Sequence, residues 1–264
     1  MNLINENDYT DKVRGGRNDY YSFDEANLAV LRLMRLRARR GATVLDLGCG
    51  RGRLGAELRQ LGYHVTGVES ETAPFAAAQS VLDEALEFDL TDYAAADAAL
   101  GARRFDWIIA ADVLEHLAEP LAALRHYRRF IADRGRIVIS VPNVAVWYNR
   151  LRILAGRFDY EESGVMDRRH LRFFTRRSAR QLVIQAGFTP MQVDLDPGIA
   201  RAFTPIARKM GRRRAEAAGP DAILSMPLYR IYASYLWPAE RIICRLAPGL
   251  LGFRIVIEAG LSDS

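Results

Sequence analysis

The chain has 264 residues, of which 50% are hydrophobic and 26% are charged. This balance is typical of a folded globular protein and excludes a disordered or collagen-like chain. The formal net charge is +5, but arginines are spread along the whole sequence, so the charge by itself predicts no nucleic-acid partner.

Cysteine usage and the N-terminal residues bear on localisation. Cys49 and Cys244 are the only two cysteines, too few for a disulfide framework or a cysteine-based zinc site. The first twelve residues are polar and mixed in charge, unlike a secretory signal, and no stretch reaches the roughly 20 apolar residues that cross a bilayer. We therefore expect a cytoplasmic protein, and a peripheral contact at the inner face of a membrane is left open.

Short strand-like segments alternate with helical patterns along the chain. A helix is expected at 24–40, where apolar side chains repeat at helical spacing. Strands are expected at 43–47, 64–69, 85–88, 105–111, 136–141, 191–195 and 253–258. This alternation predicts an α/β fold, with a largely parallel, doubly wound sheet and helices on both faces.

Two regions are longer than a minimal doubly wound domain needs, 142–175 and 197–252. Long insertions commonly determine substrate specificity. Within the second region, residues 222–246 read as a helical segment with only a narrow polar stripe. Pro238 is expected to kink or interrupt this helix. We expect this segment to pack against its own domain or a second copy, rather than on a membrane.

A glycine-rich turn follows the first predicted strand, in the run VLDLGCGRGRLG at 44–55. Gly48, Gly50 and Gly52 allow the backbone to turn tightly and to approach a ligand closely. About 20 residues later the second strand ends in Glu69, the position from which an acid binds a ribose diol.

The same turn also fits a second class of enzyme. Gly50, Gly52 and Gly55 match the G-x-G-x-x-G pattern of dinucleotide enzymes, so an NAD(P)-dependent oxidoreductase is an alternative. Asp46 favours another cofactor, because a carboxylate at this turn repels a pyrophosphate and attracts the ammonium of an aminoacyl group. S-adenosylmethionine (SAM) carries such a group and no phosphate, so we expect SAM.

The sequence resembles the class I SAM-dependent methyltransferases, and within them the methyltransferase domain 23 and type 11 groups. Besides the glycine turn, the resemblance rests on the segments FDL at 88–90, FDWIIAADVLEHL at 105–117, GRIVISVPN at 135–143 and DRRHLRFFT at 167–175. It implies a Rossmann-like sheet of seven strands, mostly parallel with the last strand antiparallel. One domain, 1–264, is expected, made up of an N-terminal helical region (1–40), the SAM-binding core (41–141), a substrate-side half (142–195), a helical insertion (196–252), and the last strand and tail (253–264).

The resemblance also implies the residues that contact SAM. The glycine turn surrounds the methionine part, Glu69 holds the ribose hydroxyls, Asp89 contacts the adenine amine, and Asp112 faces the methionine end. The predicted cofactor-binding residues are Asp46, Gly48, Cys49, Gly50, Gly52, Glu69, Asp89, Leu90 and Asp112.

Candidates for catalysis follow strands four and five, because the ligand crevice of an open α/β sheet lies beyond the carboxyl ends of its strands. His116 is the predicted general base and His170 the second candidate, although a base is needed only if the acceptor must lose a proton. Each histidine has a structural alternative: a backbone hydrogen bond for His116 and a folded lid for His170. Asp112, Glu115 and His116 resemble the metal-binding cluster of some quinone-pathway O-methyltransferases. This chain has Asp where that cluster has Glu, so whether it binds a metal is left as unknown.

The resemblance thus implies transfer of a methyl group, at oxygen, to a small-molecule, sugar or lipid-linked acceptor. From the relatives of this group we expect a saccharide first and a quinone-like ring second. Nucleic acid is not expected, because no Asn/Asp-Pro-Pro-Tyr run follows strand four. A non-catalytic SAM-fold partner protein is the other alternative. The sequence leaves open whether the protein forms a homodimer.

Overall fold

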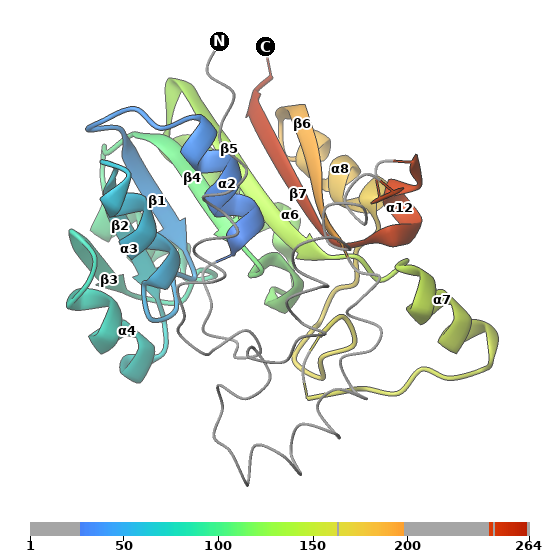
Figure 1. Cartoon of the computed structure of the whole chain (residues 1–264). Coiled ribbons are helices and arrows are strands. Elements are labelled where there is room, and N and C mark those ends of the chain that lie inside the picture. The colour runs from blue at the N-terminus through green and yellow to red at the C-terminus, as the bar shows by residue number, and fades with distance from the viewer. Residues whose placement is uncertain (1–26, 163, 198–242, 245, 263–264) are drawn as a thin grey trace, which may run out of the picture.

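The computed structural model describes residues 27–162, 164–197, 243–244 and 246–262. In these ranges a seven-stranded sheet has the order β3-β2-β1-β4-β5-β7-β6 (Figure 1). Its strands are β1 Thr43–Leu47, β2 His64–Glu69, β3 Glu84–Glu87, β4 Phe105–Ala111, β5 Ile131–Pro142, β6 Phe188–Pro197 and β7 Gly252–Leu261.

The last strand, β7, pairs antiparallel with both β5 and β6, whereas β1 pairs parallel with β2 and β4. The predicted seven-stranded, doubly wound α/β sheet with an antiparallel last strand is therefore confirmed. β7 lies between β5 and β6, so β6 forms the sheet edge. Strands β5, β6 and β7 are longer than predicted because their ladders continue into less apolar residues.

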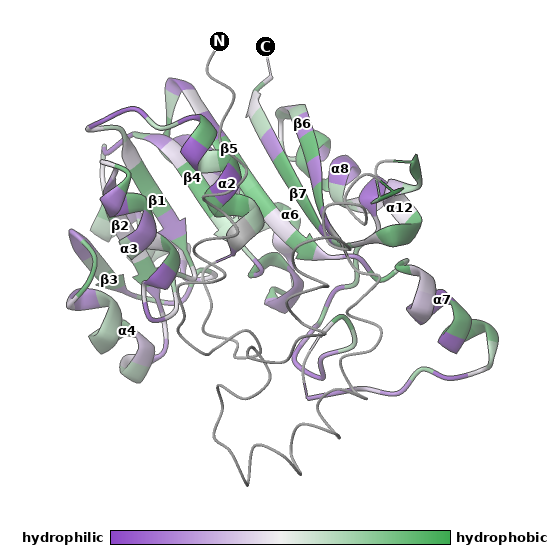
Figure 2. Cartoon of the chain, viewed as in Figure 1, coloured by the Kyte–Doolittle hydropathy of each residue, from purple (hydrophilic) through white to green (hydrophobic). Residues whose placement is uncertain are grey.

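Helices cover both faces of the sheet, because successive apolar residues of its strands point to opposite faces. Val44 packs with the helices at 28–36, 53–60 and 72–79 on one face. The next residue, Leu45, packs with the helices at 93–100, 120–127 and 176–185 on the other face. Figure 2 shows largely apolar strands flanked by helices that carry both apolar and hydrophilic residues. The helices are α2 Leu28–Leu36, α3 Arg53–Gln60, α4 Thr72–Gln79, α5 Tyr93–Leu100, α6 Pro120–Tyr127, α7 Trp147–Leu154, α8 Arg176–Gln185 and α12 Pro248–Leu251, with 3-10 turns η1 Leu114–His116 and η2 Arg128–Phe130.

Helix α2 is shorter than the predicted span of 24–40. Its first described turn begins at Asn27, whose side chain accepts a hydrogen bond from the backbone of Val30 at 3.1 Å. The helix ends at Leu36, and the following residues are exposed and not helical. Residues 24–26 lie outside the described ranges.

The two predicted insertions differ in how much of them is described. The segment 142–175 contains α7 and then returns to the sheet through an isolated bridge between Asn143 and Phe174. Most of the segment 197–252, including residues 222–242, lies outside the described ranges. Among the residues that the structure describes, no helix has the length and apolar character needed to cross a bilayer.

Candidate functional site

The glycine turn after β1 lies at the carboxyl edge of the sheet. Gly48 has φ of 65°, and a Cβ there would lie 2.5 Å from Cγ2 of Val113, so this glycine is required by packing as well as by backbone conformation. Gly50 has φ of 55°, but a Cβ there would meet no atom within 4 Å. The backbone at Gly50 therefore faces open space, which is where a ligand can approach. Gly52 precedes α3 as its N-cap residue.

Glu69 connects the end of β2 to this turn. One carboxylate oxygen accepts a hydrogen bond from the backbone of Gly50 at 2.9 Å. The other accepts hydrogen bonds from the backbone of Ser70 at 2.8 Å and of Glu71 at 3.0 Å. The acid predicted to hold the ribose is thus fixed beside the glycine turn, with its oxygens oriented by backbone donors.

Asp46 is a buried acid on β1, with a side chain in the interior beside the same turn. Its residue is 2% exposed, and its Oδ2 atom has no hydrogen-bond partner among the described residues. Burial, followed by the nearby negative charge of Glu69, raises the pKa of Asp46 to about 7. A buried carboxylate oxygen without a hydrogen-bond partner is costly, and a cationic group bound nearby would relieve that cost.

Cys49 serves packing in the ligand-free protein. It is buried, and a Cβ on Gly67 of β2 would lie 2.6 Å from its sulfur. Burial raises the pKa of the Cys49 thiol well above its ordinary value, and the charges of Asp46 and Glu69 add to this effect. A neutral, enclosed thiol is not a nucleophile.

Asp89 and Leu90 follow β3 toward the same edge. Asp89 accepts hydrogen bonds from the backbone and hydroxyl of Thr91, at 2.7 and 2.6 Å, and these bonds lower its pKa. The side chain of Leu90 is in the core, and its carbonyl accepts a hydrogen bond from Tyr127 at 3.1 Å. Their predicted contact with adenine stays a prediction.

Asp112 follows β4 and has an unusual backbone, with φ of 56°. Its Oδ1 atom accepts hydrogen bonds from Ser140 at 2.8 Å and from Arg254 at 3.0 Å. Its Oδ2 atom accepts one from Asn27 at 3.0 Å and lies 2.8 Å from a second guanidinium nitrogen of Arg254. Four donor atoms from three residues occupy the lone-pair positions of the carboxylate. The predicted contact of Asp112 with the cofactor therefore stays a prediction that this geometry does not favour.

Three side chains gather just past β4: Glu115, His116 and His170. Their ligand-type atoms all lie within 4.8 Å of one another, and the two imidazole rings meet edge to face at a centroid distance of 4.9 Å. Glu115 is 1% exposed, its Oε2 atom has no hydrogen-bond partner among the described residues, and burial raises its pKa well above the ordinary value. Carboxylate and imidazole groups at this separation could also hold a divalent cation.

Backbone contacts explain how residues more than 50 positions apart reach one cluster. The backbone N–H groups of Leu171 and Arg172 donate to the carbonyl of Glu115, at 2.8 and 3.0 Å. Nδ1 of His116 lies 3.2 Å from the carbonyl oxygen of Arg169. The sequence grouped Asp112 with Glu115 and His116, whereas the structure brings His170 into that group and joins Asp112 to Arg254. His170 is buried, and burial lowers its pKa.

Sequence reasoning missed the ion pair of Arg254 and the structural role of Asn143. Nothing in the local pattern of β7 sets Arg254 apart, because its partner is 142 residues away. Asn143 is fully buried, and its amide donates to the carbonyl oxygens of Gly252 at 2.7 Å and Gly249 at 3.2 Å. Asn143 therefore fixes the end of β5 to the start of β7.

Comparisons with known proteins agree with this geometry. A family model described as a methyltransferase domain matches residues 20–193. A ubiquinone biosynthesis O-methyltransferase of Azorhizobium caulinodans is 32% identical over 124 residues, which are 47% of this chain and 49% of the relative. The chain thus spans about half the length of that relative.

Solved structures show the same fold at lower identity. A SAM-dependent methyltransferase from Archaeoglobus fulgidus is similar with a TM-score of 0.55 and 17% identity, covering 95% of this chain and 97% of that one. A 1,6-didemethyltoxoflavin-N1-methyltransferase of Burkholderia thailandensis, crystallised with S-adenosylhomocysteine, has a TM-score of 0.54 and 19% identity, covering 97% and 87%. At these identities the likeness concerns the fold alone.

Proposed function

The chain belongs to the class I SAM-dependent methyltransferases, and from this we propose that it transfers the methyl group of SAM to an oxygen atom of a small-molecule or lipid-linked acceptor. The observation that carries the cofactor assignment is Asp46, a buried acid beside the glycine turn whose Oδ2 atom has no hydrogen-bond partner among the described residues. SAM supplies an ammonium for such an acid and, at its sulfonium, an electrophilic methyl group. A phosphate-bearing dinucleotide would meet repulsion at the same place.

His116 is proposed as the base that removes the acceptor's proton. Its Nδ1 atom lies 3.2 Å from the Arg169 carbonyl, so an Nδ1–H tautomer donates to this oxygen and leaves Nε2 free to accept a proton. The acceptor oxygen then attacks the methyl carbon, the carbon–sulfur bond breaks with its electron pair going to sulfur, and the proton stays on Nε2. His170, buried against the His116 ring, is assigned a positioning role in this scheme.

A quinone-like acceptor is proposed ahead of a saccharide. The support is a relative that shares 32% identity over part of the chain, a ubiquinone biosynthesis O-methyltransferase. Peripheral contact with the inner face of a membrane would suit a lipid-linked acceptor of this kind. A homodimer is a further proposal, and sedimentation velocity would test it.

Calorimetric titration tests the cofactor assignment directly. S-adenosylhomocysteine should bind with a micromolar dissociation constant, and NAD should give no saturable heat. Saturable NAD binding would instead support the oxidoreductase alternative, and binding of neither compound would support a non-catalytic partner protein. Labelled SAM incubated with fractionated cell extracts should then transfer label into a small organic or lipid fraction.

A further inference from the structure

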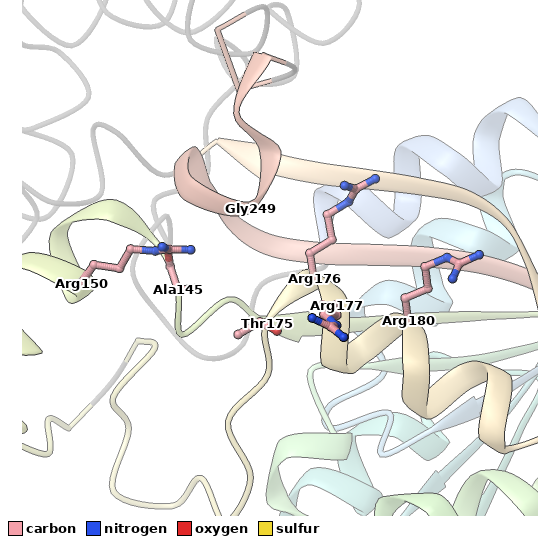
Figure 3. A pocket seen from close by; sticks show the side chains of 7 residues that line it. All are labelled: Ala145, Arg150, Thr175, Arg176, Arg177, Arg180 and Gly249. Atoms are coloured by element: carbon pink, nitrogen blue, oxygen red, sulfur yellow. The ribbon is translucent and has the colours of Figure 1, made fainter.

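A hollow lined by arginines lies outside the candidate site. Its volume is about 580 Å³, and Arg150, Arg176, Arg177 and Arg180 line it together with Thr175. Figure 3 shows the three arginines of α8 on one side and Arg150 of α7 on the other, directed toward Ala145. This volume is in the range of pockets that bind small ligands, roughly 300–1,000 Å³.

Within the described part of the chain, no acidic side chain that lines this hollow balances its positive charge. The structure gives Arg176, Arg177 and Arg180 no ion pair, although most other arginines of the described ranges have one, as Arg254 has with Asp112. Arg176 and Arg180 are also one helical turn apart, a spacing at which like charges repel.

The local backbone adds to the same electrostatic preference. Thr175 is the N-cap of α8 and forms a capping box with Ser178, so these two residues satisfy each other. The backbone N–H groups of Arg176 and Arg177, at the first two helical positions, have no acceptor within the helix. The positive end of the helix dipole thus coincides with two guanidinium groups, and the first turn has no acidic residue. Arg176, Arg177 and Arg180 are exposed, and a bound anion would offset their charge more directly than water does.

We propose that the arginine-lined hollow binds the phosphate or diphosphate group of a small ligand. Guanidinium groups bind phosphate oxygens through paired, charge-assisted hydrogen bonds. Several guanidinium groups around one hollow favour a polyvalent anion over a single carboxylate, because each additional negative oxygen can take a further donor. This inference does not depend on methyl transfer, since none of these residues belongs to the glycine turn or to the histidine cluster.

Calorimetric titration with inorganic pyrophosphate tests the proposal, with acetate as the monovalent comparison. The wild-type protein should bind pyrophosphate saturably, at one site per chain, and more tightly than acetate. The double variant Arg176→Gln/Arg180→Gln should bind it at least about 10-fold more weakly, because two guanidinium forks are lost. The variant Arg176→Lys/Arg180→Lys keeps the charge but not the forks, and should lose less than the glutamine pair.

A matched control removes the same charge elsewhere. Arg104 and Arg134 are exposed and do not line the hollow, so Arg104→Gln/Arg134→Gln should change pyrophosphate affinity by no more than about 2-fold at 0.15 M salt. Affinity for S-adenosylhomocysteine should be equal in all these proteins, which shows that the fold and the cofactor site are intact. Equal losses of pyrophosphate affinity in the two glutamine pairs would overturn the proposal, since the effect would then be one of overall charge.

Sedimentation with phosphatidylglycerol vesicles separates a small ligand from a lipid surface. If wild-type protein binds these vesicles through Arg176 and Arg180 but gives no saturable heat with pyrophosphate, the hollow is a membrane contact and the proposal fails. If neither probe binds, it fails as well. Saturable pyrophosphate binding that is lost only in the pocket variants supports it.

Discussion

Arg254 of β7 and Asp112 at the end of β4 form an ion pair, with a guanidinium nitrogen 2.8 Å from the carboxylate oxygen. Their side chains are 18% and 28% exposed, so the pair is largely shielded from water. Because β5 lies between these two strands in the sheet, the pair crosses over a neighbouring strand. The pair thus engages the residue with the positive φ, at the point where the chain leaves β4 toward His116.

Arg254→Met should destabilise the protein, because it leaves the Asp112 carboxylate shielded and without its cation. The expected loss is about 3 kcal/mol in urea unfolding. Arg157→Met is the control, since the Arg157–Asp159 pair is well exposed and an exposed pair contributes roughly 0–1 kcal/mol. A larger effect of Arg254→Met on affinity for S-adenosylhomocysteine than on stability would show that Asp112 acts on the cofactor after all.

Gly48 and Gly50 provide a matched pair of substitutions in the turn. Gly48→Ala introduces a methyl group 2.5 Å from Val113 and should cost roughly 2–3 kcal/mol of stability through overpacking and backbone strain. Gly50→Ala adds a methyl group to open space, so only strain of about 1 kcal/mol is expected, while binding of S-adenosylhomocysteine should fall steeply. Thermal unfolding would measure the stability of each variant, and calorimetry would measure its affinity for S-adenosylhomocysteine. Equal stability losses in the two variants would contradict this division of roles.

Local patterns in the sequence predicted the sheet and the glycine turn because both depend on residues close together in the chain. The alternation of Val44 and Leu45 between two cores follows from the period of a strand, and the distance from the turn to Glu69 is fixed by one βαβ unit. The approach of His170 to His116 depends on how a long segment returns to the sheet, and no local pattern contains that information. The Arg254–Asp112 pair could not be predicted for the same reason, because its two residues are 142 positions apart.

Binding of the cofactor product should depend on pH through Asp46, whose pKa burial raises to about 7. Only the ionised carboxylate attracts the ammonium group, so affinity for S-adenosylhomocysteine should rise as pH increases through 7 and level off near 8, and below 7 it should fall by up to about 10-fold per pH unit. Asp46→Asn should remove this dependence. Calorimetry from pH 6 to 8.5 would measure it, and an unchanged slope in the variant would assign the titration to another group.

Asp46→Asn should also change the stability of the ligand-free protein. Because the folded pKa of Asp46 lies above the unfolded value of 3.8, the folded state binds its proton more tightly, and this contribution to stability is lost as pH rises from about 4 through 7. Asp46→Asn should therefore stabilise the ligand-free protein at pH 8, by roughly 2–4 kcal/mol. Urea unfolding at pH 5 and pH 8 would show the difference, and a variant less stable than wild type at pH 8 would contradict the assigned cost of burial.

The proposed base, His116, is tested by separating binding from turnover. His116→Ala should bind S-adenosylhomocysteine normally, because the imidazole lies beyond the glycine turn, yet lose roughly 100-fold in turnover. The matched control is His64→Ala, since His64 is exposed on β2 and should leave both quantities unchanged. The loss in His116→Ala should shrink for acceptors that are already ionised, because they need no base. A merely structural histidine would instead lower stability and affect all acceptors alike.

A chelator decides between a proton acceptor and a metal ligand at the same residue. If His116 acts as a base, wild-type turnover in the presence of EDTA should equal turnover without it. If turnover falls with EDTA and returns with Mg²⁺ or Zn²⁺, the cluster of Glu115, His116 and His170 holds a cation and the base assignment is wrong. Glu115→Gln sharpens the comparison, because it removes a carboxylate that a hard cation needs while leaving the His116 imidazole in place. Under the base assignment this variant should retain most of its turnover, whereas a metal-dependent reaction should be lost with it.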